Sequence, residues 1–100
     1  MILTEGVFDC WRVGEDAVAT FGTHITEEQK KLIHRKNLKE LIFAWDGDAY
    51  WKARKIAQQF TCSLEKVRIV LFNKEEDPDS YGKEFSSESL CNKINKAELL

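Results

Sequence analysis

An unbroken apolar run that stops at two aspartates constrains the fold of this chain more than any other feature. The run, LIFAW at residues 41–45, is followed directly by Asp46, Gly47 and Asp48. A short apolar run bounded by polar residues predicts a strand buried on both faces, as in a parallel sheet. Residues 49–60 then carry apolar side chains at helical spacing. The sequence therefore predicts a unit of strand, acidic turn and helix.

Two interpretations of this acidic turn are open. An aspartate before a helix is a good N-cap and Asp-Gly is a common turn pair, so Asp46 and Asp48 fit a purely structural role. Alternatively, ligands bind at the carboxyl edge of parallel strands, and two carboxylates there suit a hard divalent cation such as Mg²⁺. Gly47 would let the backbone turn sharply and bring both carboxylates to the same site at the sheet edge.

Length and composition indicate one globular domain with no general attraction to polyanions. The chain has 100 residues, 43% of them hydrophobic, and a net charge of −2, so nucleic-acid binding would need a local patch or metal ions. No run is long enough to span a membrane and no signal-peptide pattern is present, which predicts a cytoplasmic location without membrane contact. Cys10, Cys62 and Cys91 are odd in number and widely spaced, which predicts reduced thiols.

Strand and helix patterns alternate along the rest of the chain. Strands are expected at residues 1–4, 17–21 and 66–72, and helices at 7–13, 26–35 and within 83–96, with a loop at 73–82. Together with the central unit, this order predicts an α/β domain of four parallel strands with helices on both faces. Phe85, Leu90 and Ile94 are spaced for the last helix. The side chains expected to face the core from the first two helices are Val7, Phe8, Trp11, Leu32 and Ile33, with Cys10 as a further candidate.

Acidic residues follow three of the four predicted strands. They are Glu5, then Asp46 and Asp48, then Asp77 and Asp79. Strand ends of a parallel sheet share one edge, so these carboxylates should converge, and they would resist ionisation unless a cation neutralised them. Asp9 lies one helical turn after Glu5, so its side chain could face the same sheet edge. Alternatively, it could simply be a first-turn acid favoured by the helix dipole. The cluster therefore predicts divalent metal and suits in-line phosphoryl transfer.

These motifs, in this order and each after a strand, resemble those of the Toprim domain. They are Glu5-Gly6 with Asp9, Asp46-Gly47-Asp48 and Asp77-Pro78-Asp79. Residues 19–23, followed by Thr26 and Gln29, resemble a segment of DnaG-type primases, including phage and plasmid relatives. The similarity covers nearly the whole chain. It implies a Toprim (Rossmann-like) fold, with residues 1–100 as a single Toprim domain that is a fragment of a larger protein.

The resemblance also implies a function and a site. The function is nucleotidyl transfer in RNA primer synthesis during DNA replication, dependent on Mg²⁺ or Mn²⁺. Glu5 would be the general acid/base, and Asp46, Asp48, Asp77 and Asp79 would be metal ligands, with Asp9 as a further candidate. The implied partners are a single-stranded DNA template and nucleotides in the full-length context, and a replicative helicase or other domains of the parent protein.

Other functions share the same motifs, and one stretch departs from the family pattern. A Toprim nuclease or topoisomerase module and a non-catalytic Toprim interaction domain are the alternatives. Tyr50 and Trp51 stand where primases usually carry small residues. These aromatic side chains could narrow the site, stack on a nucleotide base, or pack against a neighbouring helix or domain.

Overall fold

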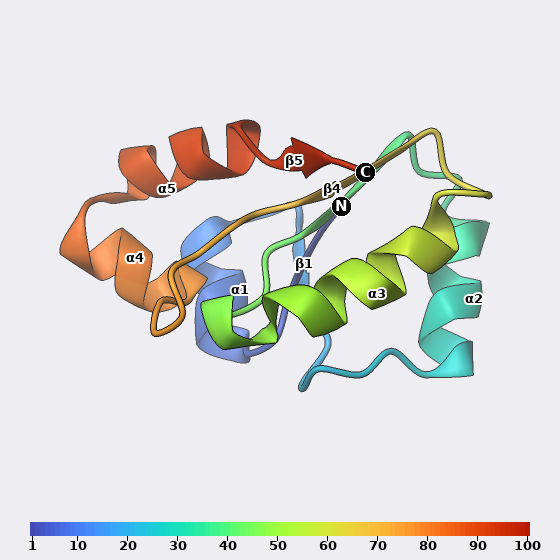
Figure 1. Cartoon of the computed structure of the whole chain (residues 1–100), viewed down its shortest axis with the longest axis horizontal. Coiled ribbons are helices and arrows are strands. Elements are labelled where there is room, and N and C mark those ends of the chain that lie inside the picture. Colours follow the sequence, from blue (N-terminus) through green and yellow to red (C-terminus); the bar gives the residue numbers. More distant parts are fainter.

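The apolar run becomes the central strand of a five-stranded sheet in the computed structural model, which describes residues 1–100 (Figure 1). The strand order is β2-β1-β3-β4-β5. The first four strands, β1 (Ile2–Thr4), β2 (Ala17–Ala19), β3 (Glu40–Phe43) and β4 (Lys66–Ile69), are parallel neighbours, with Ile42 opposite both Ile2 and Arg68. The mostly parallel α/β architecture predicted from the sequence is therefore confirmed.

Helices cover both faces of this sheet, as predicted. They are α1 (Val7–Val13), α2 (Glu27–Arg35), α3 (Tyr50–Phe60), α4 (Pro78–Glu84) and α5 (Ser87–Asn95), with a 3₁₀ turn η1 (Gly47–Ala49) before α3. One core cluster joins Phe43 and Trp45 to residues of α2 and α3. The other joins Ile42 and Ala44 to α5, so β3 is buried on both sides. None of the helices combines the length and the apolar character needed to cross a membrane.

The C-terminal third differs most from the sequence prediction. Residues 78–82 were expected in a loop, but α4 begins at Pro78, because Asp77 and Ser80 form a capping box and proline suits the first helical position. The single helix expected within 83–96 is two helices, because Ser86 caps a new one. The short strand β5 (Glu98–Leu99) pairs antiparallel to β4 and was not predicted.

Several boundary and burial predictions were also wrong. Strand β2 stops at Ala19, and Phe21 takes a positive φ of 60° and is exposed. Strand β4 ends at Ile69, although the buried residues Val70 and Phe72 extend the apolar pattern. Three side chains expected in the core are exposed, because their short helices turn these positions away from the sheet: Phe8, Trp11 and Leu32. Ile33 is buried as expected. Of the residues spaced for the last helix, Leu90 and Ile94 are buried in α5, whereas Phe85 is the exposed C-cap of α4.

Candidate metal centre at the sheet edge

Glu5 follows β1 directly and joins it to the turn after β3. Its Oε1 accepts a hydrogen bond of 3.0 Å from the backbone N–H of Asp46. The N-cap of α1 is Gly6, and no side chain caps that helix. Glu5 therefore connects two strand ends at the acidic edge and has no part in capping the helix beside it.

The Asp46-Gly47-Asp48 turn is held against the loop after β4. Asp46 precedes η1 but its side chain makes no capping hydrogen bond, which removes the purely structural interpretation of this carboxylate. The backbone N–H of Gly47 donates to the carbonyl of Glu76 at 2.8 Å. A Cβ on residue 47 would overlap the backbone carbonyl of Asn73. Gly47 is therefore required by this close approach, and its φ is not positive.

Five carboxylates meet at this edge in two overlapping groups. The first contains Glu5, Asp46 and Asp48, and the second contains Asp9, Asp46 and Asp77. Within each group one carboxylate oxygen per residue lies within 4.8 Å of the others. Asp46 belongs to both groups and is the centre of the cluster. This spacing is short enough for the oxygens of one group to contact a single cation.

Burial and mutual repulsion raise the pKa values of three carboxyl groups in the cluster. Asp46 Oδ1 is buried and has no hydrogen-bond partner. Burial, followed by the charges of the other four acids of the cluster, raises the pKa of Asp46 to about 7. Burial also raises the pKa of Asp9 to about 6, against a hydrogen bond from the backbone N–H of Asp79. The pKa of Glu5 is raised by burial and by the Asp48 and Asp77 charges. A cation would reverse these shifts.

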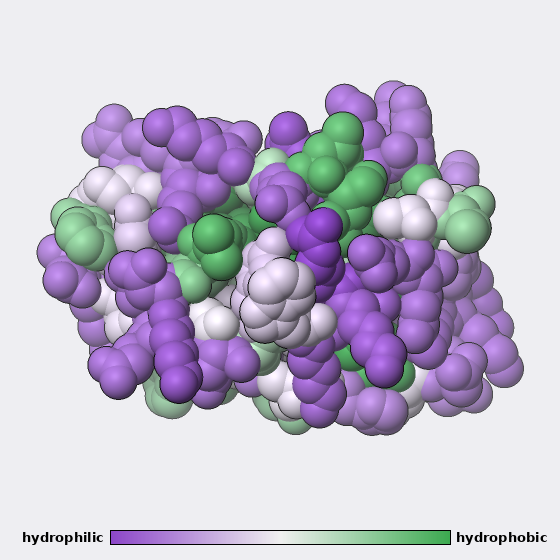
Figure 2. Space-filling model, in the orientation of Figure 1, coloured by the Kyte–Doolittle hydropathy of each residue, from purple (hydrophilic) through white to green (hydrophobic).

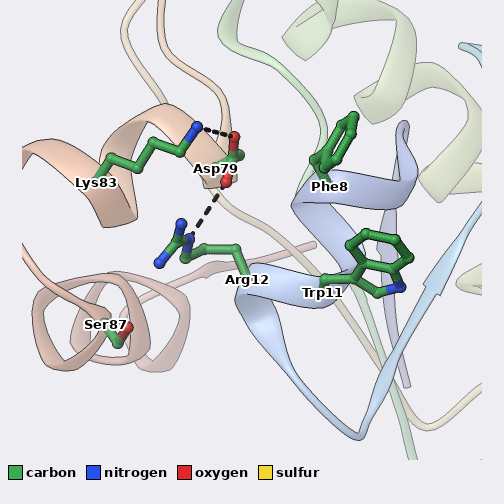
Figure 3. A pocket seen from close by; sticks show the side chains of 6 residues that line it. All are labelled: Phe8, Trp11, Arg12, Asp79, Lys83 and Ser87. Atoms are coloured by element: carbon green, nitrogen blue, oxygen red, sulfur yellow. Dashed lines mark hydrogen bonds and ion pairs between the residues drawn. The ribbon is translucent and has the colours of Figure 1, made fainter.

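Asp77 and Asp79 lie two residues apart but have different environments. Asp77 caps α4, accepting a 2.7 Å hydrogen bond from the backbone N–H of Ser80, and it also belongs to the second acidic group. Asp79 lies outside both groups. Its carboxylate oxygens contact Arg12 Nε at 3.2 Å and Lys83 Nζ at 3.1 Å (Figure 3). Partial burial acts to raise the pKa of Asp79, but the hydrogen bonds from Lys83 and Arg12 lower it overall.

The two cations beside Asp79 were missed by the sequence analysis. Lys83 had a local signal, because it lies one helical turn after Asp79, at the i,i+4 spacing typical of ion pairs. Arg12 had none, because 67 residues separate it from Asp79 and only the packing of α1 on α4 brings them together. With Phe8, Trp11 and Ser87 these residues line a cavity of about 460 Å³ (Figure 3).

Comparison with known proteins places this chain in a family. A family model described as Toprim-like matches residues 2–82, and the chain belongs to the Toprim-like family. It is a Toprim domain that matches the catalytic core of DnaG-type DNA primases. The DNA primase of Halalkalibacterium halodurans is 33% identical over 96 residues, which cover 87% of this chain and 15% of that primase.

Two solved structures agree with this assignment. The Aquifex aeolicus primase structure, with zinc-binding and RNA polymerase domains, matches with a TM-score of 0.81 and 35% identity, covering 99% of this chain and 26% of that one. A DnaG primase catalytic domain solved bound to single-stranded DNA has a TM-score of 0.77 at 24% identity, covering 99% of this chain and 34% of that one. This second match is a likeness of fold. The chain thus spans well under half the length of these relatives.

Proposed function

We propose that this chain is the Mg²⁺-dependent nucleotidyl-transfer module of a DNA primase, acting within a larger enzyme in RNA primer synthesis for DNA replication. The observation that carries the proposal is the buried, unpartnered Oδ1 of Asp46 inside a cluster of five carboxylates. A buried polar atom without a partner costs stability, so such an arrangement persists where a ligand completes it. The similarity to primase catalytic cores supports nucleotidyl transfer as the chemistry.

The residues proposed to hold metal are the aspartates of the two acidic groups. Asp46 and Asp48 would bind one ion, beside Glu5, and Asp9 and Asp77 would share Asp46 for a second. An all-oxygen set of this kind suits Mg²⁺ or Mn²⁺. When bound, these ions would neutralise the carboxylates and stabilise negative charge on phosphate oxygens. Asp79 remains a weaker candidate ligand, because Arg12 and Lys83 already neutralise it.

Glu5 is proposed as the general acid/base. Its Oε1 accepts a hydrogen bond from the backbone N–H of Asp46, which holds the carboxylate at the acidic edge. The raised pKa of this carboxyl makes it a stronger base than an ordinary glutamate. Glu5 would accept the proton of a 3′-hydroxyl as the hydroxyl oxygen bonds to the α-phosphorus of a nucleotide, and the bond to the leaving pyrophosphate breaks.

The alternatives differ from this proposal in what attacks the phosphorus or in whether chemistry occurs at all. A Toprim nuclease would use the same acids with water as the attacking group. A topoisomerase needs a nucleophilic tyrosine, which normally lies in another domain. Of the two tyrosines here, Tyr50 has its hydroxyl bound by Glu98 and Arg54, and Tyr81 packs its ring against Phe72 and Phe85. A non-catalytic module has no need of five converging acids. The proposed partners are a single-stranded template, nucleotides, and a replicative helicase or other domains of the parent protein, in the cytoplasm.

A domain exchange tests this function directly. Residues 1–100 replace the matching segment of the Aquifex aeolicus primase, and primer synthesis on single-stranded DNA is measured. We expect the exchanged enzyme to make primers. Loss of a general base typically costs about 10²–10⁴ in rate, so Glu5→Gln should remove most synthesis while keeping the affinity for Mn²⁺.

The matched control is Glu15→Gln, which removes an exposed acid outside the cluster and should leave synthesis unchanged. Near-normal turnover of Glu5→Gln would remove Glu5 from the chemistry, and a large loss of Mn²⁺ affinity would make it a ligand instead. An exchanged enzyme that binds Mn²⁺ and cleaves DNA without making primers would favour the nuclease. The 100-residue chain alone is expected to make no primers, because primases hold the template with regions beyond this domain.

A further inference from the structure

A second pocket opens beside Asp48, on the α3 side of the acidic edge. Its volume is about 470 Å³ and its walls are Gly47, Asp48, Tyr50, Trp51, Leu71 and Lys74. Asp48 also belongs to the acidic group with Glu5 and Asp46. The pocket is therefore continuous with the candidate metal centre, and a ligand bound at those carboxylates could extend into it.

Two large apolar side chains of this pocket contribute nothing to the core. Trp51 is 76% exposed and Leu71 is 62% exposed. The core-facing side of α3 is formed by other residues, Ala53, Ala57 and Phe60, which are buried. On the face shown in Figure 2, green hydrophobic surface and pale surface of intermediate hydropathy lie among the purple hydrophilic side chains. Exposed apolar surface of this kind, bordered by polar residues, is typical of a binding site.

The indole of Trp51 is supported from one side. The ring of Tyr50 meets it edge to face, with the centroids 5.1 Å apart and the planes at 87°. The Tyr50 hydroxyl donates to Glu98 at 3.1 Å and accepts from Arg54 at 3.0 Å, so contacts from α3 and β5 fix the supporting ring. Trp51 is thereby positioned while most of its own surface stays open to solvent. A supported, exposed indole is a ready stacking surface for a flat ligand.

Charge in this pocket is arranged for a ligand that is flat at one end and anionic at the other. Lys74 lines the pocket and takes part in none of the six ion pairs of the chain. Asp48, in the same pocket, belongs to the acidic group that can hold a divalent cation, which in turn binds phosphate oxygens. A nucleoside triphosphate has this combination of a stacking base and a charged phosphate chain. The pocket volume lies in the range of small-ligand sites.

We propose that Trp51, Leu71 and Lys74 form the base-binding subsite for a nucleoside triphosphate whose phosphates lie at the acidic metal centre. This inference rests on the proposed nucleotidyl-transfer function. Trp51 supplies the stacking face, Leu71 adds a second apolar contact for the base, and Lys74 offers a positive charge to the phosphates. Because primases usually carry small residues where Tyr50 and Trp51 stand, the subsite would be a particular property of this chain.

Nuclear magnetic resonance of the 100-residue chain tests the subsite, because each tryptophan gives one indole N–H signal. The signals of Trp11, Trp45 and Trp51 are assigned with single Trp→Phe variants. With Mg²⁺ present, ATP should shift the Trp51 indole signal and the Gly47 backbone amide. Inorganic tripolyphosphate, which has no base, should shift the Gly47 amide and leave the Trp51 indole in place.

Matched variants measure the contribution of stacking. Trp51→Ala should weaken ATP binding by about 5- to 150-fold and leave tripolyphosphate binding unchanged. Trp11→Ala is the control, because Trp11 is similarly exposed, at 72%, on a different helix, and it should bind ATP normally. Both positions are open to solvent, so neither change disturbs the core.

The outcomes separate this subsite from the function on which it rests. Equal ATP affinity of Trp51→Ala and the unchanged chain would overturn the subsite, as would an ATP-induced shift at Gly47 without one at Trp51. No ATP-induced shift at all, or a Trp51 shift produced only by an oligothymidylate, would also overturn it. If Mg²⁺ alone leaves the Gly47 and Asp48 amides unmoved, the metal centre itself fails, and with it the proposed function.

Discussion

Two aspartates that follow neighbouring strands in the same kind of motif have opposite electrostatic environments. Asp46, after β3, has only acids around it, and burial with those charges raises its pKa to about 7. Asp79, after β4, is bound by Lys83 and Arg12, and its pKa is lowered. The motif places both residues near one sheet edge. Partners from other helices determine which carboxylate is left to attract a cation.

The difference arises from the elements that surround each residue. Asp46 follows a strand covered on both faces, so its neighbours are the acids that end the adjacent strands. Asp79 lies in the first turn of α4, which packs on α1 and brings Arg12 within reach. The two regions still touch, because the Asp79 N–H donates to Asp9 at 2.9 Å. One edge therefore combines an uncompensated acidic cluster with a neutralised acid.

The largest expected effect comes from substituting Gly47, which lies between two aspartates of the uncompensated acidic cluster. Gly47→Ala would drive a Cβ into the backbone carbonyl of Asn73, and backbone cannot move aside as a side chain can. We expect a loss of about 3 kcal/mol in the free energy of unfolding, the upper part of the usual range for overpacking. Urea denaturation of the purified chain measures it.

The comparison variant is Gly82→Ala, in helix α4, which also carries the neutralised Asp79. There a Cβ would meet Arg12 Cδ at 2.7 Å, and that side chain can swing away. Alanine is also favoured over glycine inside a helix by about 0.5–1 kcal/mol, which offsets part of the cost. A Gly82→Ala loss as large as that of Gly47→Ala would contradict the distinction between rigid and flexible neighbours.

The next effect is the response to metal. At ten times its dissociation constant, a bound ion stabilises the fold by about 1.4 kcal/mol, which corresponds to roughly 6–11 °C in Tm for a domain of this size. Asp46→Asn should abolish this Mn²⁺-induced rise, and it should raise the metal-free Tm at pH 8 by removing a repelled charge. Asp79→Asn should keep most of the response. Equal loss of response in both variants, seen by thermal scanning and calorimetric titration, would place Asp79 among the principal ligands.

The pH dependence of stability should follow the raised pKa values. The folded chain holds protons on Asp46 up to about pH 7 and on Asp9 up to about pH 6, whereas unfolded aspartates release theirs near pH 4. Stability from these groups is therefore present at low pH and is lost as pH rises from about 4 to 7. The metal-free Tm should be higher at pH 5 than at pH 8.

Asp46→Asn and Asp79→Asn show which aspartate causes the change in Tm between pH 5 and pH 8. Asp46→Asn should flatten the difference between pH 5 and pH 8, and excess Mg²⁺ should do the same in the unchanged chain. The pKa of Asp79 is lowered, so its contribution is present above about pH 4 and is lost only below it. Asp79→Asn should therefore keep the unchanged chain's slope between pH 5 and pH 8. A flat profile for the unchanged chain without metal would contradict the raised pKa of Asp46.

The sheet and the convergence of its acids could be predicted because their signals are local. The apolar run of β3 has a length and polar boundaries that few other elements share. The capping box of Thr26 and Gln29 marked the start of α2, and both of its hydrogen bonds are present. Once parallel strands were inferred, the positions of Glu5, Asp46 and Asp77 at one edge followed from topology.

The remaining features depend on contacts that periodicity does not encode. Helix α1 has seven residues, too few to show which apolar positions face the sheet, and Phe8 and Trp11 are exposed. Strand β5 has two residues, so no alternation could reveal it. The Arg12–Asp79 pair depends on the packing of α1 against α4. The sequence therefore indicated which acids share the edge, but not which of them is neutralised.

The smallest expected effect concerns Lys83, the more exposed of the two cations that neutralise Asp79. The Lys83 side chain is 65% exposed and pairs with Asp79 at i,i+4 spacing, a contact worth about 0.3–0.5 kcal/mol. Lys83→Ala should therefore barely change the free energy of unfolding, but it should raise the pKa of the Asp79 carboxyl, measured by NMR titration. Arg12→Ala removes the less exposed partner and should raise that pKa as well.

If Asp79 is a metal ligand restrained by these cations, the Arg12→Ala, Lys83→Ala double variant should bind Mn²⁺ more tightly than the unchanged chain. Unchanged affinity would mean that Asp79 serves only to join α1 to α4.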